Sequence, residues 1–382
     1  MTSVWLIQDV IAPYRVPLFA EIARSRDFNF TVVLTTPKCQ ARPDWNNAGQ
    51  GMPFKVLTMW GTSIPLSFER TFPISFGLLP LLIKRKPDIV ICCGFSLSTL
   101  MVFIYSKIFR KKYIVWSEST ETTERIRGHE GKLRTLFRRM MAANAKAFID
   151  AGKLSRTYIR SLNRSKDKIS FFRSYNCVDS SLFSSCSDDG LEHNITRDLA
   201  DRKILFVGRL STRKGIPMLM DVYDEVLKKF RNNVDLILVG EGPLRKNVER
   251  FMRDTESARV KLCGQVAYSR VARYYRECDL FILLSLSDCN PLVIFEALHS
   301  GIPIICTDRA GNAPDFIVEG KNGHIVNPED KDSIVQRVLE VLSWDSVKRR
   351  EAAEISKQLV RKANYQDSAK AFIDACRYAM HK

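Results

Sequence analysis

Residues 280–300 read LFILLSLSDCNPLVIFEALHS, and this stretch decides the fold class. The apolar run at 280–284 has the length of a buried strand. A polar loop follows it, in which Asn290 suits the cap of a helix and Pro291 its first position, where a missing N–H is harmless. A short apolar strand that runs through a loop into a helix indicates a parallel sheet covered by helices on both faces.

Glu296 is the only charged residue in the helix-like run 290–301. On a wheel of 3.6 residues per turn it joins no polar stripe, because apolar side chains occupy both sides: Leu292, Val293 and Ala297 on one, Ile294, Phe295 and Leu298 on the other. An unpaired carboxylate costs several kcal/mol when it leaves water, so Glu296 needs donors. Either another part of the core supplies them, or a ligand does, through a pair of neighbouring hydroxyls.

The strand and helix pattern recurs along the chain. Strand-like runs lie at 4–8, 30–35, 54–58, 89–93, 112–117, 147–151 and 169–172, and then at 203–208, 235–240, 260–263, 280–284, 302–307 and 323–326. Two such series in 382 residues predict two doubly wound α/β domains, since one core rarely grows that large.

The boundaries of these domains follow from composition. We expect a first domain at 1–178, a Ser- and Asp-rich linker at 179–202 and a second domain at 203–364. The chain is helical from Asp330 onward, and a last helix at about 365–382 can pack back on the first domain or elsewhere.

Charge is concentrated in the first half. Residues 1–180 hold 28 lysines and arginines against 13 acidic residues, whereas the remainder is nearly balanced at 31 against 29. This asymmetry suggests an anionic partner for the first half, and nucleic acid and acidic lipid both qualify. Since no RNA- or DNA-binding motif is found, nucleic acid is the weaker of the two.

Targeting and redox signals are sparse. The N-terminus lacks the charged start and cleavage site of a signal peptide and reads as a core strand. Residues 89–105 are uncharged, but a strand at 89–93 and a helix from about Ser96 explain them better than a membrane span does. The ten cysteines form no CxxC pair and no metal-like cluster, which indicates buried thiols of a reducing compartment.

A second strand, loop and helix unit, FVGRLSTRKGIPMLMDVYDEVLKKF at 206–230, carries two cations, Arg209 and Lys214, in its loop. Cations beside the orphan N–H groups of a helix N-terminus suit a diphosphate, although solvated loop charges are the plainer interpretation. Asp288 and Glu296 are expected at the same sheet edge. Together these groups suit a nucleotide diphosphate that carries a sugar, with no metal needed because the cations neutralise the phosphates.

Residues 203–344 closely resemble the donor domain of the GT-B retaining glycosyltransferases of family 4, the glycosyl transferases group 1. The matching segments are VGRLSTRKG, LVGEGP, VKLCGQV, CDLFILLSLSDCNPLVIFEALHSGIPIICTD and EGKNGHIVNPED, in the family order, and NCVDSSLF at 176–183 matches the start of the family's interdomain crossover. The resemblance implies two Rossmann-like domains facing a central cleft.

The resemblance also implies roles for residues of the second domain. Arg209 and Lys214 would bind the donor diphosphate, Glu296 the ribose, and Asp288 the transferred sugar. Donor-binding positions on the same segments are Gly208, Gly240, Cys289, Asn290, Pro291 and Leu292. Asp288 stands where glutamate is commoner, and DCNP lacks the usual glycine, so the preference for a donor sugar stays open.

The first domain resembles the family less. QDVIAPYRVPLF at 8–19 is similar to a variant first loop, with Asp9, Tyr14 and Arg15 as candidate acceptor-binding residues. None of the five histidines falls at 115–125, where many members carry one. Glu118 stands there instead, either as a catalytic group or as a surface carboxylate.

Residues 131–149 read GKLRTLFRRMMAANAKAFI and predict an amphipathic helix. Its apolar stripe is Leu133, Leu136, Phe137, Met140 and Ala147, flanked by Lys132, Arg134, Arg138, Arg139 and Lys146. A helix packed on the domain is one interpretation, and an interfacial helix on anionic lipid is the other.

The resemblance implies a retaining glycosyltransferase that uses a UDP- or GDP-linked sugar without a metal cofactor. We expect a glycan or lipid-linked acceptor, a role in bacterial cell-surface polysaccharide or glycolipid synthesis, and a peripheral position on the cytoplasmic face of the inner membrane. Alternatives are a nucleotide-sugar epimerase, a sugar phosphorylase and a catalytically silent GT-B scaffold.

Overall fold

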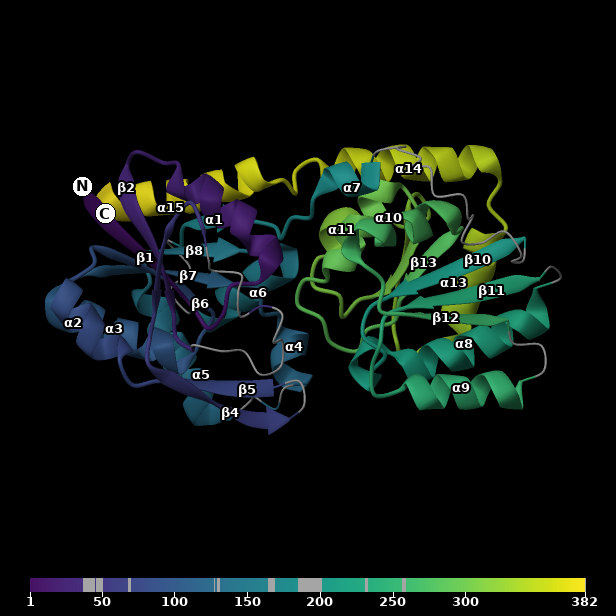
Figure 1. Cartoon of the computed structure of the whole chain (residues 1–382), viewed down its shortest axis with the longest axis horizontal. Coiled ribbons are helices and arrows are strands. Elements are labelled where there is room, and N and C mark those ends of the chain that lie inside the picture. Colours follow the sequence, from purple (N-terminus) through teal and green to yellow (C-terminus); the bar gives the residue numbers. More distant parts are fainter. Residues whose placement is uncertain are drawn as a thin grey trace. The chain divides into compact units, whose positions relative to one another are not determined.

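The computed structural model describes residues 1–36, 45, 51–67, 70–126, 128, 131–163, 169–184, 201–230, 233–255 and 259–381, the side chains of 62–67, 70–74 and 184 excepted. The chain divides into two compact units. The first unit comprises Met1–Cys177 and Ala363–Lys382, and the second comprises Val178–Lys362. Figure 1 shows both units and labels most of their elements.

The first unit is built on a seven-stranded parallel sheet in the order β3-β2-β1-β6-β7-β8-β9. The strands are β1 (Thr2–Gln8), β2 (Phe28–Leu34), β3 (Lys55–Thr58), β6 (Ile89–Cys93), β7 (Lys112–Ser117), β8 (Ala147–Asp150) and β9 (Phe171–Arg173), each within about two residues of its expected position. Both faces are buried: Val4 and Leu6 enter one core cluster, and Trp5 and Ile7 enter the other.

Helices cover both faces of this sheet. The first cluster packs under α1 (Val16–Ala23) and α15 (Tyr365–His381), and the second under α2 (Leu78–Arg85), α3 (Leu97–Phe109), α5 (Lys132–Asn144) and α6 (Lys153–Leu162). The remaining elements are η1 (Pro13–Arg15), α4 (Glu121–Ile126) and the hairpin of β4 (Gly61–Ser67) and β5 (Arg70–Ser75), which the sequence did not predict.

The uncharged stretch 89–105 is a strand and a helix, as predicted. β6 ends at Cys93, and the Ser96 side chain accepts a hydrogen bond from the Thr99 N–H to cap α3. Within the described ranges, none of the helices combines the length and apolar character needed to cross a membrane.

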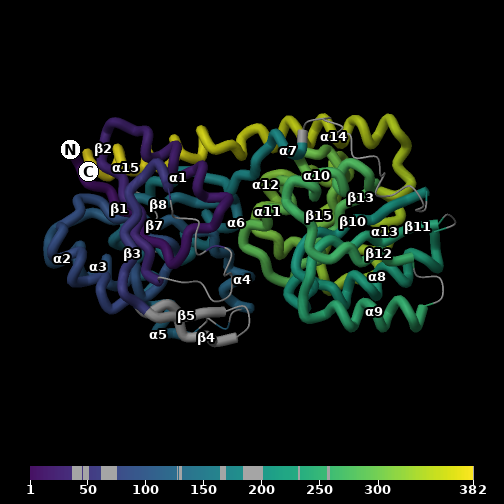
Figure 2. Tube along the Cα trace, in the orientation of Figure 1, coloured from purple at the N-terminus to yellow at the C-terminus, as the bar shows by residue number. Residues whose placement is uncertain are grey.

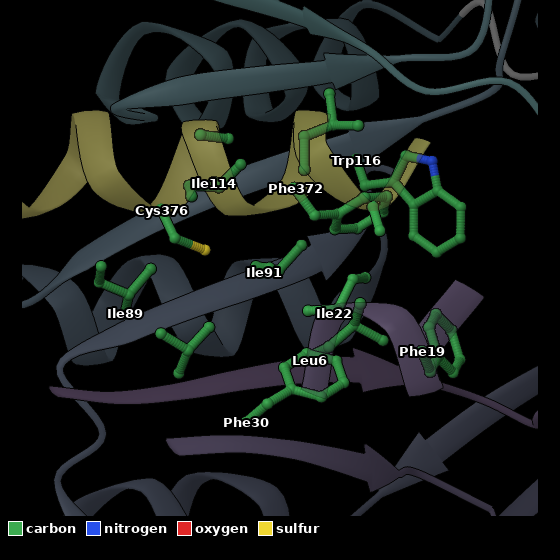
Figure 3. Packing of buried hydrophobic residues seen from close by; sticks show 14 of the residues in the cluster. Leu6, Phe19, Ile22, Phe30, Ile89, Ile91, Ile114, Trp116, Phe372 and Cys376 are labelled. Carbon is green, nitrogen blue, oxygen red and sulfur yellow. The ribbon is translucent and has the colours of Figure 1, made fainter. Parts of the chain in front are cut away.

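The C-terminal helix α15 belongs to the core of the first unit. Phe372 and Cys376 are fully buried, and the Phe372 ring meets that of Trp116 edge to face, with centroids 5.0 Å apart. Figure 3 shows this helix laid across the strands that carry Ile91, Ile114 and Trp116. A segment almost two hundred residues beyond β9 therefore completes this core, which was one of the two placements that the sequence left open.

The second unit holds a six-stranded parallel sheet in the order β12-β11-β10-β13-β14-β15. Its strands are β10 (Arg202–Val207), β11 (Val234–Val239), β12 (Val260–Gly264), β13 (Leu280–Leu283), β14 (Ile304–Thr307) and β15 (Gly323–Val326). Its helices are η3 (Thr212–Lys214), α7 (Ser180–Ser184), α8 (Ile216–Lys229), α9 (Arg245–Asp254), α10 (Tyr268–Glu277), α11 (Leu292–Ser300), α12 (Ala313–Phe316), α13 (Lys331–Leu342) and α14 (Ser346–Val360).

Figure 2 traces α8 and α9 along one side of this sheet and α10, α11 and α14 along the other. Both domains are thus doubly wound, as the alternation of strands and helices predicts.

Two predictions about the organisation of the chain need correction. The expected linker begins with α7, whose Phe183 packs edge to face on Tyr268 and Tyr275 of the second unit, because an aromatic residue gains more from burial than from a solvated linker. Residues 185–200 of that prediction lie outside the described residues.

The helix expected at 131–149 forms at Lys132–Asn144, but the first of its two interpretations, an apolar stripe packed on the domain, is wrong. Leu133 and Leu136 on α5 are 67% and 61% exposed, and Ala147 lies in β8 rather than in the helix. The buried face instead holds Arg138, which donates to Glu124 and Tyr158, together with Met141 and Ala142. The ion pair gives Arg138 its place in the core and turns the leucines outward.

Candidate functional site

The second sheet reverses its strand order between β10 and β13. From β10 the chain adds β11 and β12 on one side, and from β13 it adds β14 and β15 on the other. Loops that leave the carboxyl ends of two such strands diverge and form a crevice, which is where ligands bind in open α/β sheets. The loops here are residues 208–215 and 284–291, which carry the predicted residues Arg209, Lys214 and Asp288.

Gly215 locks the first of these loops against the second. Its φ is +75°, and a Cβ atom at this position would lie 1.9 Å from the carbonyl oxygen of Leu284. The Leu286 N–H donates to the carbonyl of Arg213 at 2.8 Å, and the Arg213 guanidinium donates to the carbonyl of Ser287 at 3.1 Å. The two loops thus form one interlocked structure.

Two further glycines bring the end of β11 into the same structure. A Cβ atom at Gly240 would lie 2.0 Å from the carbonyl oxygen of Gly208, and one at Gly242 would lie 2.3 Å from that of Leu210. The Leu210 N–H also donates to the carbonyl of Glu241 at 3.0 Å. Such close backbone approach is open only to glycine.

Lys214 and Asp288 form an ion pair across the interlocked loops. The Lys214 Nζ lies 2.5 Å from the Asp288 Oδ2, and both side chains are largely buried. The backbone of Asp288 is held in turn by the loop after β14, because its N–H donates to Arg309 and its carbonyl accepts from Gly311. The two predicted ligand-binding groups therefore meet, but they bind each other.

Glu296 is buried on α11, as its apolar surroundings predict, and another part of the core supplies a donor to it, which is one of the two alternatives that the sequence left open. The Tyr275 hydroxyl donates to its Oε2 at 2.9 Å. Burial raises the pKa of Glu296 to about 7, opposed by hydrogen bonds from Tyr275 and Tyr268 and by the charge of Lys214. Neutral donors solvate the carboxylate without cancelling its charge.

Asn290 does not cap α11. Pro291 takes the cap position, the helix begins at Leu292, and both amide atoms of Asn290 are buried without a hydrogen-bond partner. Proline reaches the cap geometry because its backbone there is extended. The hydroxyl of Ser285 in the same loop is likewise buried and unbonded. A buried polar group with no hydrogen-bond partner costs about 1–3 kcal/mol. These groups therefore lower the stability of the folded loop.

The carboxyl edge of the first sheet gathers a second group of predicted residues. Arg15 donates to the Glu118 Oε1 at 2.7 Å, and its guanidinium lies over the Trp116 ring, 4.4 Å from the centroid. Glu118 is therefore neither a histidine substitute with a free carboxylate nor a solvated surface group, since Arg15 holds it in a partly buried ion pair.

Asp9 follows β1 at the same edge. Its Oδ1 accepts from the Thr35 hydroxyl at 2.7 Å. Although the side chain reaches the surface, the protein packed around the carboxylate raises its pKa against the opposing effect of that hydrogen bond.

The structure assigns parts of the site to residues that sequence reasoning missed. Gly215, Gly242 and Arg213 lock the loops, and Tyr275 binds Glu296. The position of Gly215, directly before the Ile-Pro pair that starts a helix, is a local signal for its role. No local signal marks Tyr275, which is 21 positions from its partner Glu296. Within the part of the chain that the structure describes, no three His, Cys, Asp or Glu side chains converge as metal ligands.

The interlocking of the loops predicts a large effect for Gly215→Ala. We expect a loss of about 2–4 kcal/mol in the free energy of unfolding of the second unit, because the new methyl group would overlap a backbone carbonyl. Gly320→Ala is the matched control, since Gly320 also has a positive φ but faces open space, and about 1–2 kcal/mol is expected there. Urea unfolding measures both. Equal losses of unfolding free energy in the two variants would show that the positive φ, and not the contact with Leu284, accounts for the effect.

Burial of Glu296 predicts a pH dependence of stability. Because its pKa in the folded protein is raised above the ordinary value of 4.5 to about 7, the stabilisation is complete below pH 4.5 and is lost as the pH rises through 7, in total about 3 kcal/mol. Glu296→Gln is expected to remove this component and to stabilise the second unit at pH 8. A pH profile of urea midpoints that is identical in both proteins would contradict the assignment.

Comparison with known proteins identifies this fold. Residues 191–359 match the family model described as Glycosyl transferases group 1. An uncharacterized glycosyltransferase of Methanocaldococcus jannaschii is 25% identical over 162 residues, which are 42% of this chain and 44% of that protein. The sulfoquinovosyl transferase of Arabidopsis thaliana is 28% identical over 142 residues, 36% of this chain and 26% of that protein.

The alignments thus span less than half the length of these relatives. The structure of HepE from Anabaena in complex with UDP resembles the whole chain, with a TM-score of 0.76, 18% identity and coverage of 99% of this chain and 100% of that one. At this identity the likeness shows the fold alone. Residues 191–359 therefore match the glycosyl transferases group 1, and the chain has the GT-B fold.

Proposed function

We propose that this protein transfers a sugar from a nucleoside diphosphate donor, UDP- or GDP-linked, to a glycan or lipid-linked acceptor with retention of configuration, in polysaccharide or glycolipid synthesis. The observation that carries the proposal is the interlocked pair of loops at the switch point of the second sheet, which places Lys214, Asp288 and Glu296 together. The match to the glycosyl transferases group 1 over this unit supports the same reaction class.

The ion pair of Lys214 and Asp288 suggests how the donor binds. A diphosphate carries more negative charge than one carboxylate, so it competes for the Lys214 ammonium and releases Asp288. Arg209 and the positive end of the α8 dipole add to the attraction. The freed Asp288 carboxylate then lies beside the sugar that is attached to the diphosphate, and the charge that develops on the departing diphosphate stays paired with the two cations.

Glu296 retains capacity for the ribose. A carboxylate has about four acceptor positions, and two tyrosine hydroxyls occupy two of them. Hydroxyl donors from ribose favour the charged form of the carboxylate, so donor binding is expected to lower the pKa of Glu296 from its value of about 7.

The first unit supplies the acceptor side of the proposal. Asp9, Tyr14 and Arg15 follow β1, and Arg15 ties Glu118 to the same edge. Since Glu118 is already paired, its proposed role is to orient Arg15, and the departing diphosphate itself takes the proton of the acceptor hydroxyl. No metal is needed in this scheme, because Arg209 and Lys214 neutralise the phosphates.

Removal of Lys214 or Glu296 tests the donor site. Lys214→Ala and Glu296→Ala are each expected to lower kcat/KM at least a hundredfold, because each removes a group that contacts the donor in the proposal. The controls are Lys229→Ala and Glu351→Ala, which change exposed residues of the same unit. Sugar transfer is measured with a panel of UDP- and GDP-sugars, and the coupling constant of the product's anomeric proton reports retention.

Full activity in either site variant would refute the assignment of the donor site. Sugar conversion without any acceptor would indicate an epimerase, and detectable donor hydrolysis would exclude a silent scaffold.

We further propose that the first unit binds the cytoplasmic face of a bacterial inner membrane peripherally. Its excess of positive charge favours anionic lipid, and the exposed Leu133 and Leu136 on α5 stand beside Lys132 and Arg134. An exposed apolar stripe with flanking cations is the pattern of an interfacial helix. This is the second of the two interpretations that the sequence allowed for this segment.

The α5 leucines give the membrane proposal a specific test. Leu133→Ser with Leu136→Ser is expected to weaken binding to phosphatidylglycerol vesicles about tenfold, through the loss of partial apolar burial. Val347→Ser is the control, because Val347 is exposed on α14 of the second unit. Sedimentation at low and high salt measures the effect. The proposal would be refuted if the wild-type protein remained in the supernatant after sedimentation with acidic vesicles at low salt.

A further inference from the structure

A basic cavity of about 390 Å³ lies between the ends of α3 and α5 in the first unit. Five cations line it: Lys107, Arg110, Lys111, Lys112 and Lys146. The rest of its described lining is small or polar, with no acidic and no aromatic side chain. Five positive charges around one hollow repel one another, so the site favours an anion.

The cavity is distinct from the candidate acceptor site. It opens where β7 and β8 begin, at Lys112 and just before Ala147, whereas Glu118 follows the far end of β7. Six residues of strand, at about 3.3 Å each, place these two ends roughly 17–20 Å apart. An anion held here does not belong to the reacting groups of the proposed transfer.

The local structure offsets only part of this charge. Lys111 pairs with Asp88 at 2.6 Å, and Lys112 donates to the Met380 carbonyl at 3.1 Å. The C-terminal ends of α3 and α5 contribute about half a negative charge each. Roughly three positive charges therefore remain, and Arg110 and Lys146 make no ion pair with any residue that the structure describes.

Arg110 is also held in a conformation that arginine rarely adopts. Its φ is +53°, in the left-handed region, where it caps the end of α3. A non-glycine residue there costs about 1–2 kcal/mol. The strained backbone turns the chain from α3 into β7, between Lys107 and Lys111.

Exposed apolar side chains on α3 and on its neighbour α2 indicate the source of the anion. Ile104 and Ile108, four positions apart on α3, are exposed, and Ile108 is 65% exposed directly beside Lys107. Ile83 is exposed on α2, which packs against α3. A phosphate site with an apolar margin matches an acidic lipid at a membrane surface. Sites for single-stranded nucleic acid instead combine cations with aromatic side chains on which the bases stack, and no aromatic side chain lines this cavity.

We propose that this cavity binds the phosphate of an acidic phospholipid headgroup, with Arg110 and Lys146 as its main ligands and Ile104 and Ile108 in contact with the acyl region. The inference rests on the proposed membrane association and names one site for it. It converts a diffuse attraction to a charged surface into a defined headgroup contact.

Charge reversal within the cavity tests this site. Arg110→Glu with Lys146→Glu is expected to weaken binding to phosphatidylglycerol vesicles at least tenfold at 0.1 M salt. The matched control is Lys55→Glu with Lys370→Glu, which makes the same change of charge at exposed positions of the same unit that do not line the cavity, and it is expected to weaken binding threefold or less. Thermal-shift measurements with soluble glycerophosphoglycerol test the cavity without a membrane, and UDP serves as a check that the second unit is intact.

The outcomes separate the two membrane proposals. Equal loss in both double variants overturns the headgroup site but leaves membrane association standing, as does an absent shift with the soluble headgroup. If the wild-type protein does not bind the vesicles, both the headgroup site and the membrane association are overturned. Cavity-dependent binding of single-stranded RNA without vesicle binding overturns the lipid assignment. Sugar transfer in solution to a soluble acceptor is expected to be unchanged in the cavity variant, so failure here is distinct from failure of the transferase proposal.

Discussion

The contact between Gly215 and the carbonyl of Leu284 is the constraint on which the second unit depends. It fixes the loop after β10 against the end of β13 at the point where the strand order reverses. Gly240 and Gly242 repeat the arrangement with the end of β11. The carboxyl ends of the three strands β10, β11 and β13 thus meet without intervening side chains. The charged groups in the loops that follow them are therefore close together.

The consequence is a site whose charges are balanced by the protein itself. Lys214 faces Asp288, while Glu296, with its raised pKa, faces the tyrosine hydroxyls and feels the charge of Lys214. Buried charges without partners would be too costly to keep. In the proposed function, donor binding exchanges Asp288 for a diphosphate as the partner of Lys214, so the net gain in free energy is smaller than the attraction of a diphosphate for an unpaired Lys214 would give.

The sequence predicts the fold well because its signals are local. Each strand of the two large sheets has an apolar run that is bounded by turn residues, so all thirteen were found. The hairpin of β4 and β5 was not, since it is antiparallel and lies outside both alternating series. In the candidate site, the sequence predicted where the charged residues lie but not which residues they pair with. Arg15 and Glu118 are 103 residues apart, and Tyr275 and Glu296 are 21 apart on different helices. Periodicity within one helix carries no information about such contacts.

The orientation of α5 shows why an apolar stripe alone does not establish which face of a helix is buried. A hydrophobic stripe on a helix predicts burial only if nothing else competes for the sheet-facing side. Arg138 competes because Glu124 and Tyr158 supply hydrogen bonds to it inside the core, so the helix turns and leaves Leu133 and Leu136 outside. Exposing two leucines costs stability in water, whereas the cost disappears at an apolar surface. The same rotation that looks unfavourable for an isolated domain is therefore consistent with one that works against lipid.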